Sequence, residues 1–548
     1  MNDDQKVREV EKYIDEYHKS SDFIKMFRSN RNQALFDILR VYESLSICGV
    51  IGGVSQEIFG LKNADRSIFE QVHNLQDAVN TAICWIYREC VDNETKLDFS
   101  ICETETTDFL IKYADPYSVI VDGYISYTRK ANTGHVEGNQ VIFDATPIQM
   151  QSFLRDVGER LQYKENQSLA LMEAFFSPDI QNSVSIFAAT IHTEDGRLCY
   201  SIDSNLYNLS LQVGINQWRS CAEVPQEWTF EQFTLEEYRI FWVNLYALCM
   251  IHFIAKLKSV LPGISQEDAL IVQKTKDFES CISHWSGLKK EKVATIIGYL
   301  KYDSSLKNID IMYQPLIGVG DYILITPSLI LASNPERNLI ALIHKKQDKK
   351  YFSEVNGLET QMCTELKEIV PENTDICIGK HLRDDLPDVD FGIYDKLSNS
   401  IFIAEMKWLI AADSSKEVYE RQKDINHGCE QIEQIMGYAF EDRKVFGKRI
   451  FEMEMADDPD LFCCVIVKHD LCSTNKHVPV ISISKIKELF AKYDLSTVFN
   501  IIRNQEFYGK LPEKTELGHK EVEYAGYIFK IPALIVEKDF EVWEEDYD

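Results

Sequence analysis

The stretch from Leu386 to Asp395 reads LPDVDFGIYD, and the stretch from Ile401 to Trp408 reads IFIAEMKW. Both are rich in β-branched and aromatic residues, which favour strands. Residues 396–399 (KLSN) lie between them, and four-residue connections are common in β-hairpins. The sequence therefore predicts a hairpin whose apolar strands contain acids and a lysine.

The spacing of these charges predicts a shared face. Successive strand residues point to opposite faces, so Glu405 and Lys407 lie on one side of the second strand. If the chain turns at residues 396–399, Asp390 lies opposite Glu405 and Asp388 opposite Lys407, whereas a one-residue slip would separate them. Burying unpaired carboxylates costs several kcal/mol in order of magnitude, and one lysine compensates poorly for three acids. A divalent cation would compensate better.

Asp390, followed fifteen residues later by Glu405-Met406-Lys407, resembles the D…(D/E)-x-K signature of the PD-(D/E)XK nuclease superfamily. The resemblance covers roughly residues 353 to 489. It implies an α/β restriction-endonuclease-like domain, a mixed sheet flanked by helices, which hydrolyses phosphodiester bonds of DNA with Mg²⁺ or Mn²⁺.

The resemblance also implies roles for the hairpin residues. Asp390 and Glu405 would bind the metal together with the main-chain carbonyl of Met406. Lys407 would orient or deprotonate the attacking water. Asp388 is a further candidate metal ligand.

A run from Phe352 to Ile369 has the apolar spacing of a helix. Helices at this position in the superfamily often carry a glutamate that faces the metal. Glu359 is the preferred candidate and Glu365 the alternative. An ordinary surface glutamate is the other interpretation.

Gln431, Gln434 and Tyr438 form one polar stripe on a helix predicted from Cys429 to Phe440. The last two resemble the Q-x-x-x-Y element of RecB-like members of the superfamily. Gln434 is therefore a candidate catalytic residue, and the other two are candidates for binding the scissile phosphate. A solvated stripe is the competing interpretation.

The one concentrated basic segment near these residues spans 443–449 (RKVFGKR). Arg443, Lys444, Lys448 and Arg449 are candidates for phosphate contacts. A solvated turn is the alternative.

The charge of the whole chain constrains how it can bind DNA. The 548 residues carry a formal net charge of −29, whereas nonspecific duplex affinity comes mainly from lysine and arginine. DNA contact would then be confined to a local basic patch or shared with a partner.

Helical periodicity, charge runs and turn residues divide the chain into four parts. Residues 1–270 form a mainly α-helical region for partner or substrate recognition, and 271–345 a small α/β connecting region. Strands are expected there at Ile309–Tyr313 and Tyr322–Ile325, and a helix at Leu329–Lys346. Residues 346–500 form the nuclease-like domain, and 501–548 an extension with an acidic end.

The sequence favours a cytoplasmic protein without a membrane segment. The N-terminus lacks an apolar signal-like run, and the most apolar stretch, residues 240–255, is shorter than the ~20 residues that cross a bilayer. The fourteen cysteines include no C-x-x-C pair, which fits reduced core thiols.

The expected function is a metal-dependent DNA nuclease in bacterial defence against foreign DNA or in DNA processing. The alternative is a catalytically inactive binding or scaffold protein that keeps the nuclease fold. In that case the helical N-terminal region would carry the function, through a protein partner or self-association.

Overall fold

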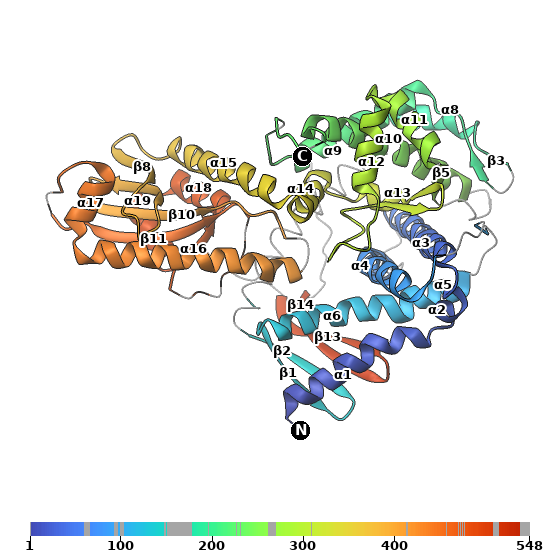
Figure 1. Cartoon of the computed structure of the whole chain (residues 1–548), viewed down its shortest axis with the longest axis horizontal. Coiled ribbons are helices and arrows are strands. Elements are labelled where there is room, and N and C mark those ends of the chain that lie inside the picture. Colours follow the sequence, from blue (N-terminus) through green and yellow to red (C-terminus); the bar gives the residue numbers. More distant parts are fainter. Residues whose placement is uncertain are drawn as a thin grey trace.

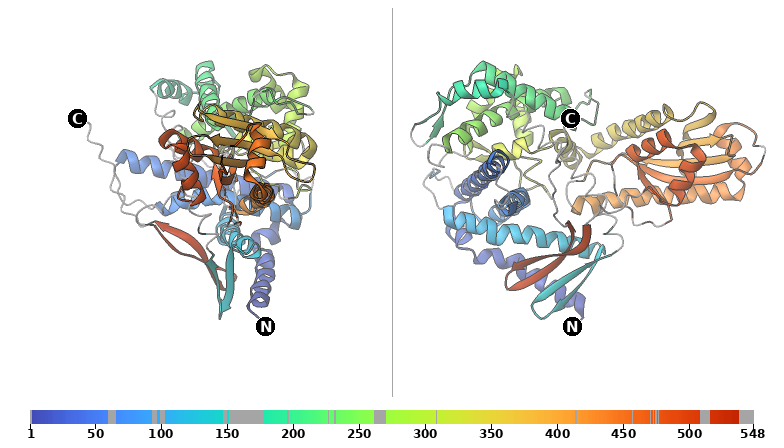
Figure 2. Two further views of the ribbon diagram at one scale, coloured as in Figure 1. Left: turned by 90° about the vertical axis from the view of Figure 1, so that its left-hand side faces the viewer. Right: turned by 180° about the vertical axis from the view of Figure 1, so that it is seen from behind.

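The computed structural model describes residues 2–59, 66–92, 97–98, 103–146, 150, 178–194, 197–225, 227–230, 232–260, 270–307, 309–412, 415–455, 457–469, 471, 473, 475, 477–507 and 515–536. A large helical region and an α/β domain are visible in Figure 1, with the α/β domain extending to the left. Two further views confirm that this domain projects from the rest of the chain (Figure 2). The acidic end, residues 541–548, lies outside the described residues.

The first half of the chain is mainly helical, as predicted. Its helices are α1 (Asp3–Tyr17), α2 (Asp22–Phe27), α3 (Arg31–Phe59), α4 (Arg66–Glu89), α5 (Glu103–Phe109), α6 (Asp115–Thr128), α8 (Pro178–Ala188), α9 (Ser204–Cys221) and α10 (Leu235–Val260). A 3-10 turn, His18–Ser20, follows α1, and a π-helical turn, Leu110–Ala114, precedes α6. The short strands β3 (His192–Glu194) and β4 (Arg197–Cys199) pair with each other and are antiparallel.

Helix α10 is the central helix of this region. Its N-terminus has a capping box, in which Thr234 N–H donates to Glu237 and Glu237 N–H donates to the Thr234 hydroxyl, at 2.9 and 3.1 Å. The segment Leu235–Leu257 is long and apolar enough to cross a membrane, but 89% of its most apolar window is buried inside the protein. It therefore packs as a core helix, as its sequence predicts.

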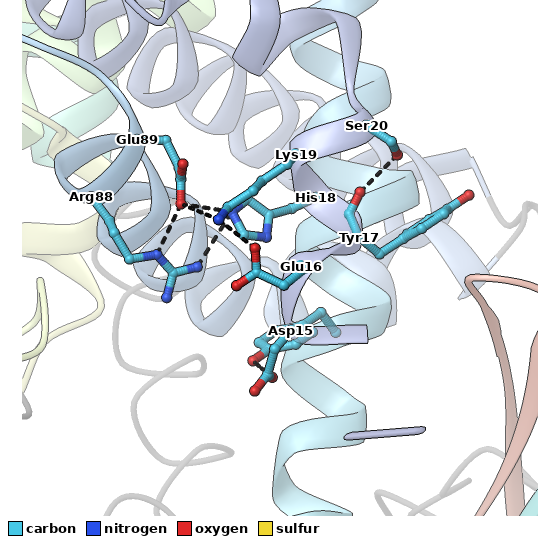
Figure 3. A network of polar contacts seen from close by, with 9 residues as sticks. Asp15, Glu16, Tyr17, His18, Lys19, Ser20, Arg88 and Glu89 are labelled. Carbon is cyan, nitrogen blue, oxygen red and sulfur yellow. Dashed lines mark hydrogen bonds and ion pairs between the residues drawn. The ribbon is translucent and has the colours of Figure 1, made fainter. Parts of the chain in front are cut away.

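Polar contacts connect the end of α1 to the end of α4 (Figure 3). The His18 ring stacks on Trp85 with centroids 4.2 Å apart, and Arg88 lies 3.3 Å from its Nε2. Glu89 pairs with Lys19 at 3.5 Å. These contacts orient α1 against the helical core.

A four-stranded sheet joins the two ends of the chain. Its order is β1 (Asn132–Glu137), β2 (Gln140–Ala145), β14 (Tyr527–Val536) and β13 (Thr515–Tyr524), with β14 parallel to β2. Apolar side chains of α1, α6, β2 and β14 form its core, among them Val10, Ile120, Phe143 and Phe529. The C-terminal extension is thus part of an N-terminal sheet, which its position in the sequence did not predict.

The connecting region contains β5 (Ile271–Lys274), α11 (Thr275–Ser286), α12 (Lys290–Leu300), β6 (Leu316–Val319), β7 (Tyr322–Ile325), α13 (Pro327–Leu331) and α14 (Pro335–Lys346). The strand expected at Tyr322–Ile325 is confirmed. The strand expected at Ile309–Tyr313 is wrong, because residues 311–313 form a turn and Leu316–Val319 pairs with β7 instead.

The single helix predicted from Leu329 to Lys346 is also wrong. Pro335 fits the first turn of a helix but not its interior. The Asn334 side chain caps the new helix by accepting the Arg337 N–H at 3.1 Å. The chain therefore breaks into α13 and α14.

The projecting domain contains α15 (Asp348–Lys367), β8 (Thr374–Lys380), β9 (Val389–Asp395), β10 (Ser400–Lys407), α16 (Ser415–Glu441), α17 (Arg443–Phe451), β11 (Asp460–Val467), β12 (Val480–Ser482), α18 (Ile483–Lys492) and α19 (Leu495–Arg503). Its strand order is β12-β11-β10-β9-β8. Strands β10, β11 and β12 are parallel, whereas β8, β9 and β10 are antiparallel neighbours. This mixed sheet agrees with the predicted fold class at the level of an α/β domain.

Helices cover both faces of this sheet (Figure 1). On one face Phe402 stacks on Phe499 of α19, with centroids 5.0 Å apart. On the other face Ile401 packs against Gly447 of α17, where a Cβ would lie 3.1 Å from Ile401 Cδ1 and 2.8 Å from Met455 Cε. Residues 443–449 belong to α17, so the turn considered for them is wrong, although Lys448 and Arg449 are solvent-exposed as that alternative expected. The Asp442 side chain caps this helix by accepting the Val445 N–H.

Buried polar contacts hold the projecting domain against the connecting region. Arg337 of α14 donates to Glu417 of α16 and, at 3.1 Å, to the carbonyl of Ala411. The Tyr313 hydroxyl donates to the same Glu417 carboxylate. Farther along, His469 lies 3.0 Å from the carboxylate of Glu223, which belongs to the helical region.

Candidate active site

The predicted hairpin register is confirmed over the paired part of β9 and β10. Ser400 pairs with Asp395, and the ladder continues to the pair of Ala404 and Phe391. The next pair in this register is Glu405 and Asp390, so both acids lie on one face. The ladder stops there because the Asp390 carboxylate, not a main-chain carbonyl, accepts the Met406 N–H at 2.8 Å.

The same geometry orients the Met406 carbonyl. In an antiparallel strand the N–H and C=O of one residue point to the same neighbouring strand. Since the Met406 N–H points toward Asp390, its carbonyl also faces the β9 side, beyond the end of the ladder. The Met406 carbonyl oxygen could therefore bind the same cation as the Asp390 carboxylate.

Glu405 is 3% exposed and contacts both charged neighbours. Its Oε1 accepts a hydrogen bond from Lys407 Nζ at 2.7 Å. The charge of Asp390 is close enough to Glu405 to raise the pKa of its carboxyl group. Its Oε2 is buried and has no hydrogen-bond partner in the described part of the chain. A buried oxygen of this kind is costly unless a ligand satisfies it.

Burial and mutual repulsion shift the titration of these acids. Burial, reinforced by the Asp390 charge and opposed by Lys407, raises the pKa of Glu405 to about 7. Burial also raises the pKa of Asp390. Burial alone would lower the pKa of Lys407, but Glu405, Glu359 and Asp390 outweigh it, so the pKa of Lys407 is raised and the side chain is an ammonium at neutral pH.

Glu359 of α15 completes this charged cluster. Its Oε1 accepts the main-chain N–H of Trp408, directly after Lys407, at 3.2 Å. Burial raises its pKa, and Lys407 opposes that rise. The alternative candidate, Glu365, instead pairs with Lys487 of α18 at 2.7 Å. Of the two glutamates considered on this helix, Glu359 is the one that lies at the site.

Gly428 is a site residue that the sequence analysis did not single out. A Cβ at this position of α16 would lie 3.1 Å from Lys407 Cε and 3.4 Å from Glu405 Cγ. Glycine therefore lets α16 pass close over the two side chains. A signal in the sequence could have found it: helical patterns lie on both sides of Gly428, and a glycine inside a helix costs about 1 kcal/mol relative to alanine, so it usually has a packing reason.

The three residues of the predicted polar stripe all lie on α16, but they differ in exposure and in their position relative to the acids. Gln431, one turn beyond Gly428, is half-buried, and its Oε1 is buried without a hydrogen-bond partner among the residues described. Gln434 is exposed. Tyr438 packs edge-on against Phe446. It lies ten residues beyond Gly428, about 15 Å along the helix. Gln431 is therefore the stripe residue nearest to the acids.

Asp388 lies outside the cluster. It precedes β9, is exposed, and its carboxylate lies 2.7 Å from Nδ1 of His381. The strand pairing that would place it opposite Lys407 does not extend this far.

The predicted phosphate-binding cations lie at the other end of the sheet. Arg443, Lys444, Lys448 and Arg449 are on α17, whose Gly447 contacts Ile401. Lys407 lies six residues beyond Ile401 along β10, which is a distance of about 20 Å. Lys448 pairs with Glu454, and Arg443 donates to the Pro459 carbonyl at 3.3 Å. These side chains do not line the acidic cluster.

The acidic cluster offers part of a coordination shell for a divalent cation. Within the described ranges, no three His, Cys, Asp or Glu side chains are grouped so that they alone could hold a metal. Asp390 and Glu405 offer two carboxylates, Met406 a carbonyl, and Mg²⁺ usually keeps several waters. The unpartnered Oε2 of Glu405 and the excess of acids over Lys407 fit a cation at this position.

Comparison with known proteins gives no relative for this chain: no family model, no curated protein and no solved structure matches it. The class of protein must therefore be inferred from the site.

Proposed function

We propose that the projecting domain is a metal-dependent nuclease of the PD-(D/E)XK type that hydrolyses phosphodiester bonds of DNA. The observation that carries this proposal is that Asp390 and Glu405 face each other one residue beyond the last pair of a buried hairpin, with Lys407 bonded to Glu405 at 2.7 Å. The order α15, β8–β10, α16, β11 and the strand order β12-β11-β10-β9-β8 support a restriction-endonuclease-like fold.

Hydrolysis adds water across the bond between phosphorus and the 3′ oxygen. Bound Mg²⁺ or Mn²⁺ would lower the pKa of a water and neutralise charge on the phosphate. Asp390, Glu405 and the Met406 carbonyl would hold the metal, and Glu359 would keep the Trp408 main chain in place through its hydrogen bond. Lys407, held by Glu405, would orient the water and stabilise the charge that develops on the phosphoryl oxygens.

The proposed biological role is defence against foreign DNA or DNA processing. The net charge of −29 supports DNA contact over a limited area, with a partner or a second copy supplying further cations. The helical first half of the chain is the region we assign to that contact.

The proposal is tested by incubating the full chain with single-stranded DNA, linear duplex, plasmid and RNA. We expect cleavage of DNA with Mg²⁺ or Mn²⁺ and none with a chelator. Glu405→Ala and Lys407→Ala protein, purified in the same way, should leave every substrate uncut, which separates the chain's own activity from a contaminant. If the wild type leaves all substrates intact with both metals, the nuclease function is rejected and the scaffold alternative is favoured.

The pKa of Glu405 predicts how metal binding depends on pH. Because this pKa is about 7, the carboxyl must release a proton to bind Mg²⁺, and the proton competes increasingly as pH falls below 7. A single group with this pKa makes Mg²⁺ binding about tenfold weaker at pH 6 than at pH 8. Calorimetric titration of the full chain without DNA measures this ratio. Glu405→Gln should bind weakly at both pH values, and equal wild-type affinity at both would contradict the site.

A further inference from the structure

The first residues of α16 lie near the middle of the molecule, where the projecting domain meets the rest of the chain (Figure 1). On one side, the Tyr419 hydroxyl of α16 donates to the Ser126 hydroxyl of α6 at 3.3 Å. On the other side, Arg337 of α14 donates to Glu417 of α16. Contacts between side chains therefore hold the start of α16 against both α6 and α14.

Each of these three helices places one cation at this junction. Arg129 directly follows the last residue of α6, Lys345 lies in the last turn of α14, and Lys416 is the second residue of α16. Lys345 Nζ lies 5.8 Å from the centroid of the Tyr313 ring, whose hydroxyl donates to Glu417, the neighbour of Lys416. Arg129 is three residues beyond the α6 serine that bonds to α16. These three side chains are the junction cations.

The junction cations are close enough to repel one another. Burial lowers the pKa of Lys416, although Glu420 opposes that shift. The charges of Lys345 and Arg129 lower this pKa further. Arg129 and Lys345 are solvent-exposed, and none of the three cations forms an ion pair with another described residue. Like charges held together in this way are unfavourable, and an anion bound among them removes the repulsion.

The nearby acids leave an excess of positive charge at the junction. Glu417 already accepts hydrogen bonds from Arg337 and Tyr313, so its charge is compensated. Glu420, the acid with the largest effect on Lys416, is then one negative charge beside three cations. In a chain with a net charge of −29, such a local excess is what contact with a polyanion requires.

The junction is separate from the acidic cluster but within reach of the same DNA molecule. Lys416 lies twelve residues before Gly428, the α16 residue that passes over Lys407, which is about 18 Å along the helix. Phosphates on one strand of B-DNA advance about 3.4 Å along the duplex axis per base pair. A duplex that follows α16 would therefore bring phosphates about five base pairs from the scissile bond to the junction.

We propose that Arg129, Lys345 and Lys416 form a binding site for backbone phosphates of the DNA on which the projecting domain acts. Their guanidinium and ammonium groups would donate to phosphate oxygens, so the contact would not depend on the base sequence. The choice of phosphate follows from the charges at the junction. The choice of DNA as its carrier rests on the proposed nuclease function.

The test measures binding of a fluorescently labelled DNA duplex to the full chain by anisotropy, with EDTA present so that the DNA stays intact. The triple variant Arg129→Gln, Lys345→Gln, Lys416→Gln should bind at least about tenfold more weakly than the wild type at physiological salt. The slope of log K against log salt concentration should become shallower by about one for each cation removed, and the single variant Lys345→Gln should already show this change. Duplexes of unrelated sequence should give the same result.

The matched control is the triple variant Lys274→Gln, Lys276→Gln, Lys289→Gln. It removes the same charge from exposed lysines of the connecting region, around α11. It should bind the duplex within about twofold of the wild type. Both triple variants should unfold at the urea concentration of the wild type or above it, because the junction cations repel one another and the control lysines are exposed.

The proposal is overturned if the wild type does not bind the duplex, if the two triple variants lose affinity equally, or if the junction variant keeps the wild-type salt slope. It is also overturned if inorganic triphosphate binds the wild type and the duplex does not, because the site would then take a small phosphate ligand. The nuclease proposal fails separately, when the bound duplex stays uncut after Mg²⁺ or Mn²⁺ replaces the EDTA.

Discussion

Lys407→Ala is expected to lower the rate of metal-dependent DNA cleavage by about 10²- to 10⁴-fold, the usual contribution of a positioned group that moves protons or stabilises charge. In the structure Lys407 Nζ donates to Glu405, which faces Asp390 just beyond the last pair of the hairpin. Removing the ammonium takes away a cation that is hydrogen-bonded to these acids. The rate is measured under single-turnover conditions with saturating Mg²⁺, so that weaker metal binding does not account for the loss.

Lys487→Ala is the control for this variant. Lys487 belongs to the same domain and also pairs with a glutamate, Glu365, at 2.7 Å. Its partner lies outside the acidic cluster, so cleavage should stay within about twofold of the wild type, as surface ion pairs contribute little. If both lysine variants keep wild-type rates, Lys407 has no part in the chemistry. If both lose activity equally, the loss reflects the domain's stability.

Arg337→Ala is expected to lower the free energy of unfolding by about 3–5 kcal/mol, as when one partner of a buried ion pair is removed. The Arg337 and Glu417 side chains are only 5% and 13% exposed. Arg337 also donates to the Ala411 carbonyl and stacks on Tyr313, with its Cζ 5.3 Å from the ring centroid. The alanine variant leaves a largely buried carboxylate, which keeps the hydrogen bond from the Tyr313 hydroxyl but loses its arginine.

The loss is measured from the midpoint of urea unfolding, with Arg239→Ala as the control. Arg239 and Glu236 form a pair at 2.6 Å on α10, but their side chains are 29% and 42% exposed. Arg239→Ala should change the free energy of unfolding by less than about 1 kcal/mol. In a double-mutant cycle, adding Glu417→Gln to Arg337→Ala should recover part of the loss. Equal midpoints for the two arginine variants would show that the buried pair contributes no more than an exposed one.

The hairpin register could be read from the sequence because it depends on a local pattern. Strand residues alternate between faces, and the length of the polar connection sets which residues face each other. Asp390 and Glu405 followed from that pattern alone. For the same reason α10 could be predicted from its apolar run, and the helical character of the first half from its periodicity.

Two predictions of local structure were wrong because packing against the rest of the chain, and not local composition, decided the outcome. Ile309–Tyr313 has the composition of a strand, but Leu316–Val319 occupies the place beside β7. Residues 443–449 look like a solvated turn, yet Ile450 and Phe446 of the same helix pack into the sheet. Composition alone cannot decide which segment forms a strand or a helix at a given position in the fold, because the outcome depends on which side chains become buried there.

By itself, the sequence determined the buried hairpin, the pairing of its two acids, the lysine beside them and the mainly helical first half. Only the tertiary structure decided that Glu359 and not Glu365 joins the site, that Gly428 passes over Lys407, and that Asp388 turns away to His381. It also placed β14 beside β2, nearly 400 residues earlier in the chain. The physical reason is that alternation and periodicity are properties of neighbouring residues, whereas these contacts depend on which surfaces pack together when the whole chain folds.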